Sequence, residues 1–379
     1  MVTSRRRRKV VIAMSGGVDS SVAACLLAEQ GYEVMGLFMR VGVEASVTDE
    51  ACSSGDTTRG HQGCCSASDA ADARFVAGQL RIPFYALNFK DDFERLIDHF
   101  ADEYTHGRTP NPCVVCNDRL KFGKLVDYAD AVGADYVATG HYARIGDRDG
   151  RPVLLKAVDP RKDQSYVLFG IDSAVLSRVL FPLGAMTKDQ VRGEALRRGL
   201  PVHAKPDSVE ICFVPDRDYA RVVRQRRPEG FIPGDVVDAE GRVLGRHDGL
   251  PHYTIGQRRG LGIAAGKPIY VTRLDVGTNT VVTGAREALF RRALLADRVK
   301  LLVDPLQGPF AAQGKIRYLH TPADATVTLL GGAQMRVEFD QPQPAITPGQ
   351  ACVLYDGDVV LGGGWIREVL DEPPAPCLS

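Results

Sequence analysis

The stretch VVIAMSGGVDSSVAACLLAEQ (residues 10–30) decides the fold of the first half of the chain. It opens with a short apolar run rich in β-branched residues, turns at Gly16-Gly17 and continues with the spacing of a helix. Glycines at such a junction let an anion approach the main chain closely, and the helix start offers it unpaired N–H groups. The stretch therefore predicts an α/β domain with an anion-binding turn after its first strand.

This turn is neither of the two most familiar nucleotide loops. The sequence has no G-x-x-x-x-G-K-S/T and no G-x-G-x-x-G, so a Walker loop and a dinucleotide fold are both unsupported. Asp19 is unusual beside a phosphate, and its simplest role is to orient Mg²⁺ that the phosphates hold. A serine-capped glycine turn without a ligand is the plain alternative. Seven consecutive positions, SGGVDSS (15–21), instead resemble the PP-loop of ATP pyrophosphatases, which cleave ATP to AMP and pyrophosphate while adenylating an acceptor oxygen.

Strands and helices continue to alternate up to Cys212. The patterns predict strands over 32–39, 83–88 and 136–139, and helices over 21–30, 74–80, 91–104 and 120–132. Such alternation predicts a parallel sheet covered by helices on both faces. The stretch 43–68 interrupts it with Gly, Ser, Thr, Asp and three Cys and has no periodicity. A loop of that length inside a compact domain is usually functional or mobile.

The second half of the chain has a different character. Arginines are dense over 215–227, and glycines alternate with short β-like runs over 230–285. From residue 286 onward, apolar and polar residues alternate in runs separated by turn residues, which is typical of a small antiparallel barrel. We therefore expect three domains: a catalytic α/β domain (1–213), a small mixed or β domain (214–285) and a C-terminal antiparallel β-barrel (286–379).

Composition limits the partners and the compartment. The 379 residues carry 47 Lys+Arg and 47 Asp+Glu, so the net charge of zero gives no general reason to expect nucleic acid. The chain has no apolar run of about 18 residues that would span a membrane, and its start does not resemble a signal peptide. Nine cysteines are an odd number at low density, which favours a reducing cytoplasm. An RNA partner would need local basic clusters, and the sequence offers 217–227, 258–259, 315–317, Arg119, Lys121 and Lys124.

Three cysteines form the second chemical pattern. Cys113 and Cys116 are spaced as C-x-x-C in TPNPCVVCNDRLKFG (109–123), and Cys212 lies in SVEICF (208–213). This spacing lets two sulfurs converge on one zinc, iron–sulfur or redox centre. A structural zinc needs four ligands, so Cys64, Cys65 or a histidine would have to join, whereas three sulfurs suit a four-iron four-sulfur cluster with one open iron. Isolated cysteines in apolar or terminal contexts are better explained as inert: Cys25, Cys352 and Cys377.

Taken together, the motifs resemble those of bacterial tRNA-specific 2-thiouridylases, in the same order and over nearly the whole chain. Other PP-loop enzymes share only the first motif. The remaining segments of the resemblance are TPNPCVVCNDRLKFG, ATGHYAR (138–144), KDQSY (162–166), SVEICF, YTIGQRRGLGI (253–263) and TPGQACVLYDG (347–357). The resemblance implies a PP-loop, Rossmann-like domain of the adenine nucleotide alpha hydrolase type, followed by a small central tRNA-binding domain (214–285) and a barrel.

The resemblance also implies a reaction. ATP would adenylate the 2-carbonyl oxygen of the wobble uridine of tRNA, and sulfur would then displace AMP to give 2-thiouridine. Cys116 would be the catalytic nucleophile and Cys212 the persulfide carrier, and the two would form a disulfide after sulfur transfer. ATP and Mg²⁺ would be required, with a sulfur donor such as a cysteine desulfurase or a sulfur carrier.

Binding residues carry over by position. Contacts to ATP are implied for the PP-loop, the next strand and the TGHY element: Ala13, Met14, Ser15, Gly16, Gly17, Val18, Asp19, Ser20, Met39 and Gly140. Contacts to the target base are implied for Asn111, Pro112 and Cys113. Further tRNA contacts are implied for His141, Lys162, Asp163, Gln164, Arg317, Tyr318 and Gln350. From the pattern alone, Asp163 is also explained as a turn cap and Arg317 as a surface charge on a barrel strand.

The chain departs from the family at Cys113, where many members have Asp. A general acid–base role at this position therefore does not transfer. Because members with C-x-x-C resemble iron–sulfur enzymes, we hypothesise that Cys113, Cys116 and Cys212 hold a four-iron four-sulfur cluster. The alternative is a persulfide relay in which Cys113 is a bystander.

Two other functions compete with tRNA thiolation. A PP-loop synthetase acting on a small metabolite would not need Cys116 and Cys212. An RNA-binding iron–sulfur redox sensor would not need SGGVDSS. Under the thiolation hypothesis, we expect the 43–68 loop to close over the site when tRNA binds.

Overall fold

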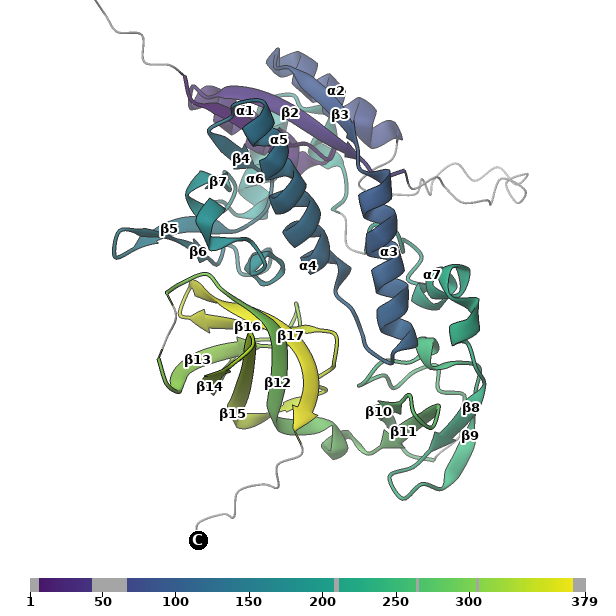
Figure 1. Cartoon of the computed structure of the whole chain (residues 1–379). Coiled ribbons are helices and arrows are strands. Elements are labelled where there is room, and N and C mark those ends of the chain that lie inside the picture. The colour runs from purple at the N-terminus through teal and green to yellow at the C-terminus, as the bar shows by residue number, and fades with distance from the viewer. Residues whose placement is uncertain (1–6, 43–66, 208–210, 264–265, 305–306, 371–379) are drawn as a thin grey trace, which may run out of the picture. The chain divides into compact units, whose positions relative to one another are not determined.

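The computed structural model describes residues 7–42, 67–207, 211–263, 266–304 and 307–370 (Figure 1). They form two compact units, one of Met1–Leu96 with Cys113–Arg217 and one of Ile97–Pro112 with Asp218–Ser379. The predicted loop 43–68 lies outside the described residues except for its last two, which begin helix α2 (Ala67–Leu80). Within the described ranges, no helix is long and apolar enough to cross a membrane.

The first unit is built on a parallel sheet of strand order β3-β2-β1-β4-β7. Its central strand, β1, contributes Val10, Val11 and Ile12, which are fully buried because helices cover both faces of the sheet. The sequence prediction of a doubly covered parallel sheet is confirmed. The strands are β1 (Lys9–Ala13), β2 (Glu33–Arg40), β3 (Phe84–Asn88), β4 (Tyr136–Ala138) and β7 (Val179–Leu180).

The helices between these strands lie close to the positions that the sequence predicts. One difference is the segment Asn117–Lys124, which forms a π-helix between two short α-helices, whereas the sequence predicted an α-helix from residue 120. Insertions of this kind are frequent at functional sites. A second difference is an antiparallel hairpin, β5 (Arg144–Arg148) with β6 (Arg151–Leu155), that the sequence did not indicate. The α-helices are α1 (Val18–Glu29), α2, α3 (Lys90–Thr105), α4 (Pro112–Cys116), α5 (Leu125–Ala131) and α6 (Lys188–Arg197).

The order of the strands reverses at β1. From β1 the chain moves outward to β2 and then β3, and it later returns to place β4 on the other side of β1. Both pairings are parallel, with Ala13 beside Leu37 and Ile12 beside Ala138. Open parallel sheets bind ligands at the carboxyl ends of strands where the order reverses in this way. Here that position is occupied by residues 14–17 after β1 and 139–142 after β4.

The second unit contains a small sheet and a barrel, each with its own apolar core. The small sheet has the order β10-β11-β8-β9, with helix α7 (Tyr219–Arg226) preceding it. Its core includes Val236, Tyr253, Leu261 and Val271. Its strands are β8 (Gly234–Val237), β9 (Val243–His247), β10 (Tyr270–Asp275) and β11 (Thr280–Gly284).

The barrel is a closed antiparallel sheet in the order β12-β15-β14-β13-β16-β17, completed by pairing of β12 with β17 (Figure 1). It confirms the predicted C-terminal barrel. Strand β13 ends at Lys315, so Arg317 lies in the turn that follows and the expectation that it lies on a strand was wrong. The sequence IRYLH (316–320) alternates apolar and polar residues, as a strand does. The turn shows the same alternation because Ile316 is buried while Arg317 is only partly buried. The strands are β12 (Phe290–Leu301), β13 (Phe310–Lys315), β14 (Ala323–Leu330), β15 (Gln334–Pro344), β16 (Ala351–Asp356) and β17 (Val359–Leu370).

Candidate active site

The loop after β1 is held open for an anion by its own glycines and serines. Gly16 has a φ of +74°, and a Cβ there would lie 2.2 Å from the carbonyl oxygen of Asp69, so only glycine fits. The Ser20 hydroxyl accepts the Ser15 N–H at 3.1 Å and donates to the Gly17 carbonyl at 3.2 Å. Gly17 brings no side chain to the start of α1, which leaves the first-turn N–H groups directed at the loop. This is the anion cradle that the sequence predicts.

The loop after β4 packs directly against this cradle. A Cβ on Gly140 would lie 2.7 Å from the backbone nitrogen of Ser20 and 2.9 Å from the carbonyl carbon of Asp19. The structure therefore brings together SGGVDSS and TGHY, which are separated by more than one hundred residues in the sequence. Of the remaining residues assigned to ATP, Met39 lies near the end of β2 at the same edge, while the side chains of Met14 and Val18 are buried in the core.

Two side chains donate hydrogen bonds to the carboxylate of Asp19. The Lys188 ammonium donates to both of its carboxylate oxygens at 2.8 Å, and the Tyr142 hydroxyl donates to Oδ1 at 2.7 Å. Burial, together with the charge of Asp19, raises the pKa of Tyr142, so the phenol stays protonated and acts as a donor. Among the described residues, Oδ2 accepts a hydrogen bond from Lys188 alone, which leaves a lone pair for a water bound to Mg²⁺. A single carboxylate beside phosphates is the usual protein contribution to a Mg²⁺ site.

A chain of alternating charges continues from Lys188. Its Nζ lies 2.8 Å from Oδ1 of Asp207, and Lys162 approaches the other oxygen of that carboxylate at 2.6 Å. Arg192 also donates to Asp207, at 2.8 Å. Burial opposes ionisation of Asp207, but the hydrogen bonds from Lys162 and Lys188 outweigh it and lower its pKa to about 2. The PP-loop carboxylate and the KDQ lysine therefore belong to one charge network.

A second lysine fixes the outer side of the cradle. Lys205 donates to the carbonyl oxygen of Gly16 at 3.0 Å, to Asp69 at 2.6 Å and to Asp72 at 2.7 Å. Burial lowers the pKa of Lys205, but the two carboxylates more than compensate and the net shift is upward. These bonds tie the first turn of α2 to the glycine turn and explain why Gly16 lies so close to the backbone of Asp69.

His141 is a neutral donor and acceptor rather than a cation. Burial, together with the charge of Lys121, holds the pKa of His141 well below its ordinary value. Its Nδ1 lies 2.6 Å from the Thr139 hydroxyl, and its Nε2 lies 3.4 Å from the Lys121 ammonium. Because an ammonium only donates, Nε2 must be the acceptor and the ring proton lies on Nδ1.

The KDQ residues are tied to the TGHY element. Asp163 accepts the backbone N–H groups of Ala157 and Ser165 at 3.0 and 3.2 Å, as a turn cap does. The side-chain oxygen of Gln164 accepts the N–H of Tyr142 at 2.9 Å. These bonds give Asp163 and Gln164 structural roles, and their contact with tRNA stays a prediction.

The cysteine set does not form a metal site in the described residues. Cys113 and Cys116 lie on α4 and share one face of it, with Cys113 exposed and Cys116 and Cys212 half-buried. Within the described ranges, however, no group of three or more His, Cys, Asp or Glu side chains is placed to hold a metal ion. The described residues thus show no metal site here, and ligation of a cluster by Cys113, Cys116 and Cys212 stays a prediction.

The sequence predicts three inert cysteines, and the two of them that the structure describes are buried. Burial raises the pKa of the Cys25 thiol to about 11 and that of Cys352 to about 12, so both are protonated at neutral pH. Cys64, Cys65 and Cys377 lie outside the described residues.

In the second unit, two predicted RNA contacts have intramolecular partners. The Arg317 guanidinium donates to the Ile255 carbonyl at 2.9 Å and to the Thr347 hydroxyl at 2.7 Å. The Gln350 amide donates to the carbonyl of Thr109 at 2.9 Å, just before Asn111 and Pro112. Tyr318 is 37% exposed, with Lys315 over its ring at 5.8 Å. Of these side chains, Tyr318 is the most accessible to a nucleic acid.

Comparison with known proteins decides the family. The tRNA methyl transferase HUP domain model matches residues 8–216, the tRNA methyl transferase PRC-barrel domain model matches 221–285, and the aminomethyltransferase beta-barrel domain model matches 291–366. The tRNA-specific 2-thiouridylase MnmA of Clostridium perfringens is 48% identical over 96% of this chain and 99% of its own. That of Geobacter metallireducens is 49% identical over 98% of this chain and 100% of its own. The chain belongs to the tRNA-specific 2-thiouridylase family.

The structure of this 2-thiouridylase family member also places residues at the site that the sequence motifs did not single out. Lys188, Asp207 and Lys205 organise the cradle, yet none was predicted. Lys188 carries one weak signal, since it is the first residue of α6, where a positive charge opposes the helix dipole. Such a lysine is better explained by an acidic partner elsewhere. Asp207 and Lys205 have no comparable local signal.

Proposed function

We propose that this 2-thiouridylase family member converts the wobble uridine of tRNA to 2-thiouridine, using ATP to activate the 2-carbonyl oxygen. The observation that carries the proposal is the cradle at the switch point of the sheet, where Gly140 lies against the backbone of Ser20 in a chain related over 96% of its length to a 2-thiouridylase. Residues Ala13–Ser20, Met39 and Gly140 are the proposed ATP contacts. We also propose that the chain works as three domains with the predicted boundaries, and the separate cores of the small sheet and barrel support that division.

Adenylation is the first step. The 2-carbonyl oxygen of uracil attacks the α-phosphorus of ATP, and the bond to the bridging oxygen breaks to release pyrophosphate. The N–H groups at the start of α1 stabilise negative charge on the phosphates. Mg²⁺ bound beside Asp19 would neutralise the departing pyrophosphate. Lys188, already within 2.8 Å of Asp19, supplies a second positive charge at the same place.

Sulfur transfer is the second step and needs only the two cysteines. The Cys116 thiolate attacks the inner sulfur of a persulfide on Cys212, which forms a disulfide between the two residues and releases hydrosulfide. Hydrosulfide adds to C2 of the adenylated uracil, AMP leaves with the former carbonyl oxygen, and the product is a C2–S double bond after loss of a proton. A cellular thiol then reduces the disulfide. A cysteine desulfurase or sulfur carrier would load Cys212, in the cytoplasm where thiols stay reduced.

The iron and sulfide content of the purified protein, rather than its activity, tests the iron–sulfur alternative. Within the described residues, no metal-binding group includes Cys113, Cys116 and Cys212, and the sulfur transfer proposed above uses no cluster. Protein purified without oxygen should be colourless and free of iron and acid-labile sulfide, and fully active once Cys212 is loaded. About four irons per chain that are lost in the Cys113→Ser variant would establish the cluster instead.

Pyrophosphate release separates the proposal from a metabolite synthetase and from an RNA-binding sensor. Release from ATP should require thio-deficient tRNA, and Asp19→Ala should abolish it. Release that is independent of tRNA would indicate a small-molecule substrate. An Asp19→Ala protein that retained its function in cells would indicate a non-catalytic role.

A further inference from the structure

The segment between α3 and α4, residues 106–111, which we call the connector, belongs to the same compact unit as the small sheet and the barrel. Its sequence is HGRTPN, and it leads into Pro112, the first residue of α4. Asn111 and Pro112 are predicted to contact the target base, and Cys113 and Cys116 follow on the same short helix. The contacts that fix the connector therefore decide where the base-contacting residues lie.

Two prolines stiffen the connector and its junction with α4. The rings of Pro110 and Pro112 fix φ at about −65°, and each proline restricts the residue before it to extended conformations. Pro112 also starts α4 with the φ that a helix needs. The run from Thr109 to Pro112 has few ways to bend, so a displacement at Thr109 moves Asn111 and Pro112 as well.

The barrel holds the connector through the loop between β15 and β16. The Thr109 N–H donates to the Pro348 carbonyl at 2.9 Å. The side-chain amide of Gln350 donates to the carbonyls of Thr109 and Pro110, at 2.9 and 3.3 Å. Gly349 between them has a φ of +90°, and a Cβ there would lie 2.9 Å from the Thr109 nitrogen, so only glycine allows this close approach.

The loop that carries Gln350 is itself bonded to the barrel. The Gly349 N–H donates to the Ile366 carbonyl at 2.9 Å, and the Ile366 N–H donates to the Gln350 carbonyl at 2.8 Å. Ile366 is a buried residue of β17, so the main chain at Gln350 is fixed by the barrel core. A side-chain amide has two N–H donors, and the two connector carbonyls account for both. To donate to RNA, Gln350 would have to release the connector.

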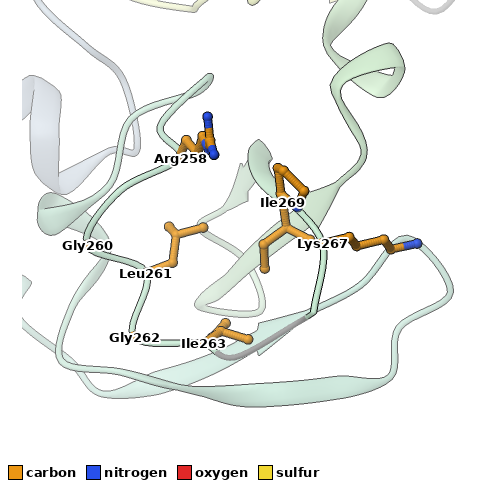
Figure 2. Close-up of a pocket in the computed structure, with 8 residues that line it drawn as sticks. Arg258, Gly260, Leu261, Gly262, Ile263, Lys267 and Ile269 are labelled. Carbon is orange, nitrogen blue, oxygen red and sulfur yellow. The ribbon is translucent and has the colours of Figure 1, made fainter.

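The small sheet lies against the earlier part of the connector. Gly107 has a φ of +65°, and a Cβ there would lie 2.8 Å from Cγ2 of Val276. Arg108 donates to the buried carboxylate of Glu103 at 2.7 Å; burial raises the pKa of Glu103, but this bond outweighs it and the net shift is downward. These contacts are separate from the hollow of about 460 Å³ in the same sheet, which residues 258, 260–263 and 267–269 line (Figure 2). The connector is thus held along its length.

We propose that Gln350 is a positioning residue for the target base, a role that rests on the proposed action on tRNA and deepens it. Its amide fixes the carbonyls of Thr109 and Pro110, and the stiff run that follows sets the positions of Asn111 and Pro112. Gln350 acts through the connector and not by touching RNA. Because a misplacement of about 1 Å can slow a reaction about 100-fold, release of the connector slows adenylation far more than it weakens tRNA binding.

Two variants that each lose one amide test this role. Gln350→Met removes the donors to the connector. Gln343→Met is the matched control, because Gln343 is also half-buried in the barrel but donates to the carbonyl of Gln341, two positions away. The tRNA dissociation constant is measured by fluorescence anisotropy, and kcat and KM by tRNA-dependent pyrophosphate release. Amide hydrogen exchange at Thr109 reports on the connector directly, because this N–H is bonded to the barrel loop.

Gln350→Met should lower kcat about 10- to 100-fold, leave the dissociation constant within about twofold of wild type, and speed exchange at Thr109. The control should resemble wild type in all three measurements. A rise in the dissociation constant and KM with unchanged kcat and exchange would overturn the proposal and assign Gln350 to RNA contact.

Thermal unfolding midpoints show whether the variants are folded. If Gln350→Met is unstable, Gln350→Asn keeps the amide but withdraws it by one methylene group, and it should lower kcat with normal tRNA affinity. Normal kcat in a folded Gln350→Asn protein with rapid exchange at Thr109 would overturn the positioning role. Wild-type protein that binds tRNA but releases no pyrophosphate would contradict the proposed function. Exchange at Thr109 would then still test the contact, and equal exchange in wild type and Gln350→Met would overturn it.

Discussion

The ammonium of Lys188 lies 2.8 Å from both carboxylate oxygens of Asp19, although 169 positions separate the two residues in the chain. The acid of the PP-loop is therefore neutralised before any nucleotide arrives. We propose that the same ammonium also stabilises the negative phosphates that ATP brings to the start of α1. Because Lys188 also contacts Asp207 at 2.8 Å, it keeps a carboxylate partner throughout.

Replacing Lys188 should therefore damage the chemistry more than the fold. Lys188→Met should lower the rate of tRNA-dependent pyrophosphate release by roughly 10²- to 10³-fold, the usual effect of removing a group that stabilises charge in the transition state. Arg192→Gln is the matched control, because Arg192 donates to Asp207 at 2.8 Å and not to Asp19. Similar losses in the two variants, measured by steady-state kinetics, would show that only the integrity of the network matters.

Asp207 should make stability depend on acid pH. Its pKa falls from an ordinary value of 3.8 to about 2 in the folded chain, so its ionised form stabilises the fold above about pH 4 and this contribution disappears as pH falls through 2. Asp207→Asn should cost about 1–2 kcal/mol at pH 7 and progressively less below pH 4. Urea unfolding from pH 7 to pH 2.5 measures the difference. Asp189→Asn, at a side chain that is 87% exposed, should show little effect at any pH. A constant cost for Asp207→Asn across this range would contradict the assignment.

Gly140 tests the apposition of the two loops. An alanine at this position would place Cβ 2.7 Å from the backbone nitrogen of Ser20, so the PP-loop must shift. We expect Gly140→Ala to weaken ATP binding by at least tenfold, measured by calorimetry, and to lower pyrophosphate release. Gly78→Ala is the control: a Cβ there meets nothing within 4 Å inside α2, and alanine should stabilise the helix by about 0.5–1 kcal/mol. Normal ATP affinity in the Gly140→Ala protein would contradict this expectation, because it would show that the two loops can move apart without weakening ATP binding.

Local patterns predicted the fold well and the long-range contacts poorly. The run through SGGVDSS predicted β1, its turn and α1 because the apolar spacing and the glycines act within a few residues. The barrel was predictable for the same reason, since strand alternation is local. Ion pairs between distant segments leave no such pattern, which is why Lys188 and Asp207 were missed.

The error at Arg317 has a physical cause of the same kind. The turn holding Arg317 repeats the polarity of a strand and was mistaken for one. The C-x-x-C spacing places two sulfurs on one face of α4, but spacing within a helix carries no information on a third ligand from another segment. Cluster ligation by these cysteines therefore stays a prediction.

The most direct test of thiolation is mass spectrometry of the wobble nucleoside. Thio-deficient tRNA is incubated with ATP, Mg²⁺, a sulfur source and either wild-type, Cys116→Ala or Cys212→Ala protein, and the tRNA is digested to nucleosides. We expect a mass increase of about 16 Da, for sulfur in place of oxygen, with wild-type protein and none with either variant. Thiolation by the Cys116→Ala protein, or unmodified uridine after complete pyrophosphate release by wild type, would contradict it.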